Sequence, residues 1–266
     1  MSAFTTAGYE FVTFLSDLGT ADEYVGVVES TIAALAPRAR VIHLSHDIEV
    51  HNVRGAALVL VRSAPHLVPG VVLASVDAGA SSRNIAVEVG GGESVLVGPD
   101  NGLLAPVVAM VGGASRVVQI GASSASVFPA RDVLAPAAAQ LCNGVDLGEL
   151  GDPVDVDSLV PAMVSFSTRD GDSIAAEVVH VDRFGNASLD VSVEQIEDMG
   201  NDLLLGGSAM TSVSSRVVHH YSELGDGETG LLVEPNGAVM VVVNGASAST
   251  RHALGVGTAV TLSLGS

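Results

Sequence analysis

The chain has 266 residues, of which 48% are hydrophobic and 3% aromatic, and its formal net charge is −19. This length suffices for a main domain and a smaller one, with cores filled mainly by Val, Ala and Leu. The eleven basic residues are all arginines and are spread thinly, which argues against a nucleic-acid partner, because phosphate binding needs clustered positive charge.

Strands and helices alternate over the first third of the chain. Apolar runs bounded by turn residues, or apolar positions at helical spacing, predict strand, helix, strand, helix and strand at 10–15, 24–35, 40–44, 51–62 and 71–76. This alternation predicts an α/β domain with a largely parallel central sheet. Ligands of such sheets bind at the carboxyl ends of the strands, and Asp17 and Asp77 each follow a predicted strand end. We therefore expect these two carboxylates to share one site.

The pattern of predicted elements changes after residue 144. Strands are predicted at 85–89 and 95–97 and helices at 103–110 and 133–141, whereas 144–167 is rich in Asp and Pro without a sustained period. Short strands then predominate, at 176–181, 187–191, 203–205, 230–233, 238–243 and 258–264. We expect an N-terminal α/β domain at 8–160 and a smaller all-β, barrel-like C-terminal domain at 172–266.

The sequence shows no sign of export or membrane insertion. Residues 1–10 lack a charged segment followed by an apolar stretch, and no window reaches about 18 uninterrupted apolar residues. Cys142 is the single cysteine, so no disulfide can form within the chain. We expect no membrane partner and a cytoplasmic location.

Six short motifs occur along nearly the whole chain: FLSDLG at 14–19, VDAG at 76–79, VGPDNGLL at 97–104, RDVLAPAA at 131–138, VDRFGN at 181–186 and VNG at 243–245. In this order they resemble the S-adenosylmethionine hydroxide adenosyltransferase family, whose relatives include fluorinating and chlorinating enzymes. The resemblance implies an N-terminal α/β domain and a C-terminal β-barrel-like domain. It also implies a homotrimer whose sites lie where one subunit's N-terminal domain meets its neighbour's C-terminal domain.

The same resemblance implies hydrolysis of S-adenosyl-L-methionine to adenosine and L-methionine, by attack of water on the 5′ carbon and without a cofactor. The leaving group is a neutral thioether that needs no acid, so the protein must mainly place the water and promote loss of its proton. Asp77 matches an Asp of the hydroxide-transferring branch, and Arg83 matches its Arg across a loop one residue shorter. Both are predicted catalytic residues. Pro129 stands where this branch has His, and proline cannot transfer a proton.

Further residues are implied to bind the substrate. Asp17 would accept hydrogen bonds from the ribose hydroxyls, since a carboxylate offers two acceptor oxygens. Phe184 would pack on the ligand, Asp182 would face the methionine ammonium, and Asn186 with the Asn-Gly pair at 244–245 would contact the adenine edge. The implied substrate-binding set is Asp17, Asp22, Asn101, Asp182, Phe184, Asn186, Asn244 and Gly245.

Some of these residues also have purely structural explanations. Asp17 can cap the helix that follows it, and Asp77 can shape a turn. Arg83 can be a solvated surface residue, and the Asp-Asn-Gly at 100–102 can serve only to form a loop.

Two functional alternatives remain open. Transfer of chloride or fluoride instead of water is one, although a negative charge at Asp77 would repel a halide. The other is a nucleoside-binding homologue with little catalysis. A metal site is not expected, because His43, His46 and His51 span a strand and a turn and not one helix face.

Overall fold

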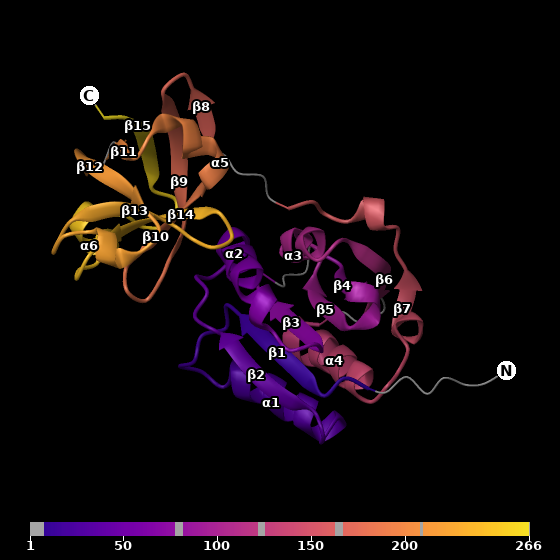
Figure 1. The fold of residues 1–266 in the computed structure, drawn as a ribbon. Coiled ribbons are helices and arrows are strands. Elements are labelled where there is room, and N and C mark those ends of the chain that lie inside the picture. Colours follow the sequence, from indigo (N-terminus) through magenta and orange to yellow (C-terminus); the bar gives the residue numbers. More distant parts are fainter. Residues whose placement is uncertain (1–7, 78–81, 122–125, 163–166, 208–209, 266) are drawn as a thin grey trace. The chain divides into compact units, whose positions relative to one another are not determined.

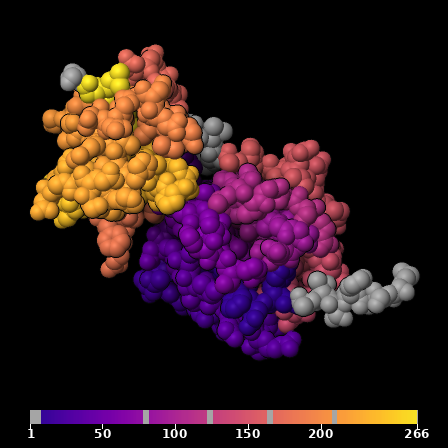
Figure 2. Space-filling view, viewed as in Figure 1, coloured from indigo at the N-terminus to yellow at the C-terminus, as the bar shows by residue number. Residues whose placement is uncertain are grey.

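The structure is a computed structural model that describes residues 8–77, 82–121, 126–162, 167–207 and 210–265 (Figure 1). By its internal packing the chain divides into two compact units, residues 1–163 and 164–266. Figure 2 shows the atoms of both units in a space-filling view. The finer domain limits expected from the sequence, 8–160 and 172–266, remain predictions.

The first unit contains a seven-stranded sheet. Its strands are β1 (Phe11–Ser16), β2 (Arg40–Ser45), β3 (Val71–Ser75), β4 (Asn84–Val89), β5 (Ser94–Pro99), β6 (Ala114–Ile120) and β7 (Gly151–Pro153), in the order β2-β1-β3-β5-β4-β6-β7. Pairing is parallel from β2 to β5 and antiparallel from β5 to β7. The change occurs because the short turn after β4 returns the chain directly into β5, and adjoining strands joined so closely run antiparallel. The predicted α/β class is confirmed.

Helices cover both faces of this sheet (Figure 1). They are α1 (Tyr24–Leu35), α2 (Val53–Ser63), α3 (Ala105–Met110) and α4 (Ala135–Cys142). In β3, Val71 and Leu73 pack into one core with α1 and α4, while Val72 and Ala74 pack into a second core with α2 and α3. All of β3 is buried, as expected for a parallel strand covered on both faces. The longest described helix, α1, has 12 residues, and no described helix meets the length and hydropathy of a membrane span.

The second unit has eight described strands, seven of which form a closed barrel. Its strands are β8 (Thr168–Asp170), β9 (Ser173–Val181), β10 (Ala187–Ser192), β11 (Asp202–Gly207), β12 (Met210–Val218), β13 (Thr229–Val233), β14 (Ala238–Val243) and β15 (Ala259–Leu264). The barrel runs β10-β14-β13-β12-β11-β15-β9 and closes where β9 pairs with β10, while β8 extends it beyond β9. Two short helices, α5 (Val193–Ile196) and α6 (Ala248–His252), accompany it. The predicted barrel-like domain is confirmed.

Strands β6, β7 and β8 were not predicted, and two further differences from the prediction are informative. The helix predicted at 51–62 begins only at Val53, because the Asn52 side chain caps it by accepting a hydrogen bond from the Gly55 amide at 2.8 Å. His51 therefore lies outside the helix. Strand β12 was not predicted, and its Ser215 is fully buried, which interrupts the apolar alternation that marks a strand.

Candidate active site

Three segments of the first unit meet at Asp17. This residue directly follows β1, and its amide donates to the carbonyl of Ser75, the last residue of β3, at 3.3 Å. One carboxylate oxygen, Oδ2, accepts hydrogen bonds from the amides of His51 at 3.1 Å and Asp77 at 3.2 Å. Asp17 does not cap α1, whose N-cap is Glu23. The structure thus brings the two carboxylates at 17 and 77 together, with a histidine between them.

His51 and Asp77 form a side-chain pair. The Nδ1 atom of His51 lies 2.8 Å from Oδ1 of Asp77. Both residues have left-handed backbones, with φ of 64° and 49°, a conformation that among the described non-glycine residues only Ala253 shares. Such strain persists only where the fold enforces it, and it gathers at functional sites. Their side chains are 73% and 45% exposed, so the pair is accessible to a ligand.

A line of hydrogen bonds starts at Ser16, next to Asp17. The Ser16 hydroxyl lies 2.8 Å from Nδ1 of His46, and Nε2 of His46 lies 2.7 Å from Nδ1 of His43. The second nitrogen of His43 lies 3.4 Å from a carboxylate oxygen of Glu29. Burial and the neighbouring His43 lower the pKa of His46. Among the described residues no group of three or more His, Cys, Asp or Glu side chains is arranged to hold a metal ion.

The hydrogen-bond partners of Arg83 are residues other than Asp77. Its Nε donates to Oδ2 of Asp100 at 2.7 Å, and its Nη2 donates to the carbonyl and hydroxyl of Ser158 at 2.9 and 3.1 Å. The other oxygen of Asp100 accepts the amide of Val160 at 2.9 Å, and the Asp100 side chain is only 4% exposed. Within the described part of the chain no hydrogen bond joins Arg83 to Asp77, and residues 78–81 between them lie outside it. Arg83 therefore fastens the segment at 158–160 to the end of the sheet.

The other two predicted residues of this unit differ in their surroundings. Asn101 donates from Nδ2 to the carbonyl of Val76 at 3.1 Å and accepts the amide of Leu103 at 3.2 Å, so it supports the backbone directly before Asp77. Asp22 is exposed in the loop that leads into α1.

In the second unit, Asp182 organises the loop between β9 and β10. Its Oδ1 accepts the amides of Phe184 at 2.9 Å and Asn186 at 2.8 Å, and its Oδ2 accepts the Asn186 side-chain amide at 2.7 Å. Asn186 is buried, whereas Phe184 is 78% exposed. Burial and the negative charge of Asp182 raise the pKa of Tyr221. An exposed aromatic ring on an ordered loop is a surface that a planar ligand can cover.

The Asn-Gly pair at 244–245 follows β14 and lies near this loop. The Asn244 side chain donates to the carbonyl of Leu224 at 2.8 Å, and Gly245 adopts φ of 77°. Helix α6, which follows the pair, is linked to the loop at 182–186, because the Gly185 carbonyl accepts the amide of Ser249 at 2.8 Å. The structure thus gathers the predicted residues into two sets, one in each unit.

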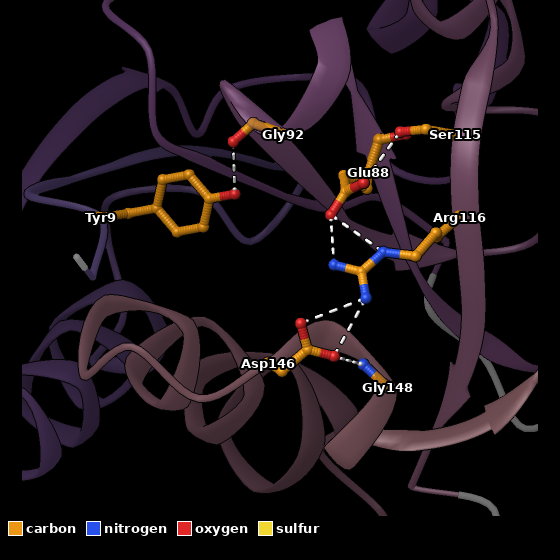
Figure 3. A network of polar contacts seen from close by, with 7 residues as sticks. All are labelled: Tyr9, Glu88, Gly92, Ser115, Arg116, Asp146 and Gly148. Atoms are coloured by element: carbon orange, nitrogen blue, oxygen red, sulfur yellow. Dashed lines mark hydrogen bonds and ion pairs between the residues drawn. The ribbon is translucent and has the colours of Figure 1, made fainter. Parts of the chain in front are cut away.

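A second polar cluster lies at the amino ends of the parallel strands of the first sheet, and Figure 3 shows its contacts. Arg116 donates to Glu88 at 2.5 Å and to both oxygens of Asp146 at 3.0 and 3.1 Å, which lowers the pKa of both carboxyls. Tyr9, which precedes β1, donates its hydroxyl to the carbonyl of Gly92 at 2.9 Å. One guanidinium pairs with two carboxylates, so Arg116 links β4 and β6 to the turn that carries Asp146.

Sequence reasoning missed His51 as the partner of Asp77 and Asp100 as the partner of Arg83. These pairs are 26 and 17 residues apart, and only the folded sheet joins them. One local signal was present for His51, because Asn52 is a favoured helix cap and would have placed the histidine in the preceding loop.

Comparison with known proteins covers both units. The models of the SAM hydroxide adenosyltransferase N-terminal and C-terminal domains match residues 12–151 and 176–261. An (R)-S-adenosyl-L-methionine hydrolase from Salinispora tropica is 34% identical over 245 residues, which are 90% of this chain and 92% of that protein. A crystal structure of an uncharacterized conserved protein from Thermotoga maritima superposes with a TM-score of 0.82 at 26% identity, covering 95% of this chain and 99% of the other.

A halogenating relative is more distant. A fluorinase from Actinoplanes sp. is 24% identical over 224 residues, which are 73% of this chain and 75% of that enzyme. The two domain models and the hydrolase together account for most of the sequence. The chain belongs to the SAM hydroxide adenosyltransferase family.

Proposed function

We propose that the protein hydrolyses S-adenosyl-L-methionine to adenosine and L-methionine, with water attacking the 5′ carbon. The main support is the contact of Asp17 with Asp77 at the carboxyl ends of the parallel strands, in a chain of the SAM hydroxide adenosyltransferase family. The sulfonium and ammonium of the substrate are both cations, which an acidic site attracts. The name of the Salinispora relative specifies the R form, and we propose the same form for this chain.

The proposed substrate contacts use atoms that the fold leaves available. Asp17 engages the two amides through Oδ2, so Oδ1 can accept from the ribose hydroxyls. Phe184 offers an exposed ring to the adenosyl group. Oδ2 of Asp182 accepts one hydrogen bond from its loop and keeps a second lone pair, which can accept a hydrogen bond from the methionine ammonium. Adenine contacts are proposed for Asn186 and the pair at 244–245, and supporting roles for Asp22 and Asn101.

Asp77 is proposed to be a catalytic residue that promotes the attack of water. Its strained backbone and its contact with Asp17 fix the carboxylate at the end of β3. For Arg83 we propose a supporting charge. Asp100 and Ser158 engage its Nε and Nη2, and among the described residues Nη1 has no hydrogen-bond partner. No step needs a cofactor, since the thioether leaves as a neutral molecule.

The reaction itself is tested by product analysis. The purified protein is incubated separately with the R and S forms of the substrate, with and without chloride or fluoride, and the nucleosides are separated by chromatography. Adenosine from the R form supports the proposal. A 5′-haloadenosine would favour the halide alternative, and unchanged substrate despite measurable binding would favour a nucleoside-binding homologue.

The role of Asp77 is tested by Asp77→Asn, because Asn tolerates the left-handed backbone at this position. Turnover should fall about 100-fold or more, while adenosine affinity changes little. Unaltered turnover would remove Asp77 from the mechanism.

We further propose that the chain works as a homotrimer in the cytoplasm, as its family resemblance implies, with small molecules and not nucleic acid as partners. Light scattering on the eluting protein measures the mass directly, and a mass of one or two chains would refute the trimer. Cell fractionation tests the location.

A further inference from the structure

Attack of water on carbon leaves a proton that must be removed. The departing thioether is neutral and takes no proton, so removal falls to a group beside the water. Imidazole is the side chain whose ordinary titration lies nearest neutral pH, which makes it well suited to accept a proton there.

His51 is presented for this task by its hydrogen bond to Asp77. The 2.8 Å contact uses Nδ1, and an ionised carboxylate can only accept, so the shared hydrogen resides on Nδ1. The other ring nitrogen, Nε2, then carries a lone pair. In the part of the chain that the structure describes, Nε2 has no hydrogen-bond partner, and the side chain is 73% exposed.

The backbone holds this pair in place. The amides of His51 and Asp77 both donate to Oδ2 of Asp17, so one oxygen atom holds the backbones of both residues close together. Both residues also adopt the left-handed conformation that a non-glycine residue rarely takes without need. The Asp17 carboxylate thus positions the His51 imidazole next to the Asp77 carboxylate.

The neighbouring histidines are not available in the same way. His46 is buried, with Ser16 on one ring nitrogen and His43 on the other. His43 contacts His46 through Nδ1 and Glu29 through Nε2. Of the three histidines in this stretch, His51 alone presents an unengaged nitrogen at the carboxyl edge of the sheet.

We propose that Nε2 of His51 accepts the proton of the attacking water, and that Asp77 positions the ring and stabilises its charged form. This rests on the proposed hydrolysis. As the oxygen–carbon bond forms at the 5′ carbon, the carbon–sulfur pair of electrons moves to sulfur and methionine leaves. The water proton moves to Nε2 and is later released to solvent.

His51→Asn is the sharpest test, because Asn accepts the left-handed backbone but cannot act as the base. Single-turnover release of adenosine should slow about 100-fold or more, with the affinity for adenosine within about twofold of the parent. His66→Asn is the matched control, since His66 is exposed in a short 3-10 helix before β3, and its rate should equal that of the parent.

Chemical rescue separates a base from a merely structural residue. His51→Gly relieves the strained backbone and opens space for free imidazole, which should restore the rate in proportion to its neutral form. If His51→Asn keeps the parental rate, or if His51→Gly is slow and imidazole does not restore it, the proposal is overturned. A parent protein that releases no adenosine would instead refute the proposed hydrolysis, so the two failures are distinguishable.

Discussion

Replacement of Asp17 by Ala removes the acceptor that orders two segments. Its Oδ2 atom receives the amides of His51 and Asp77 at 3.1 and 3.2 Å. Hydrogen bonds to a charged acceptor contribute about 1.5–3 kcal/mol each. Water can reach the exposed His51 amide and replace part of this, so we expect a local loss of about 1–3 kcal/mol at each amide.

Amide hydrogen exchange followed by NMR measures this loss at the two amides themselves. A loss of about 1–3 kcal/mol corresponds to roughly 5- to 150-fold faster exchange at His51 and Asp77. Asp17→Asn keeps an acceptor oxygen without the charge and should fall between parent and Asp17→Ala. Asp226→Ala, an exposed loop aspartate of the other unit, should leave both rates unchanged. Exchange within about twofold of the parent in Asp17→Ala would refute the hydrogen-bond argument.

Three further predictions concern packing and titration. Gly98→Ala should destabilise the protein by about 1–3 kcal/mol in urea titration, because its Cβ would lie 2.5 Å from the Ala74 carbonyl oxygen, whereas Gly26→Ala in the exposed face of α1 should stabilise it by about 0.5–1 kcal/mol. The pKa of His46 is lowered by burial and by a neighbouring histidine, so the unfolded chain binds more protons below about pH 6.5. Stability should therefore fall as the pH drops through that range, and His46→Gln should flatten this dependence in urea titrations at pH 5.5 and 7.5. Burial raises the pKa of Cys142 to about 11, so iodoacetamide at pH 8 should label it about 100-fold more slowly in the folded than in the unfolded protein, and equal rates would contradict its burial.

Local sequence signals were sufficient for the strands that lead into the site. Apolar runs followed by a polar turn predicted that Asp17 and Asp77 would come after strands, and parallel pairing of β1 with β3 then brings them to one edge. The helix limits of α1 also agree with its 3.6-residue period. These features depend on neighbours in the chain, which is why periodicity reveals them.

The sequence did not predict the contacts that depend on tertiary packing. The Arg83 guanidinium donates hydrogen bonds to Asp100 and Ser158, which are 17 and 75 residues away in the sequence. No local sequence pattern distinguishes these two residues from other possible acceptors. His51 was assigned to a helix because its neighbours carry helical spacing, yet the Asn52 cap excludes it. The missed strand β12 shows the same limit, since a buried serine looks polar in sequence.

The hairpin that carries Phe184 is also the hairpin that closes the barrel. Pairing of β9 with β10 joins the first and last strands of the ring, so the closed barrel holds both ends of the loop at 182–186. Three hydrogen bonds to Asp182 fix the loop further. A ligand that stacks on the exposed ring therefore meets a contact already ordered before binding, and little conformational entropy remains to be lost when the complex forms.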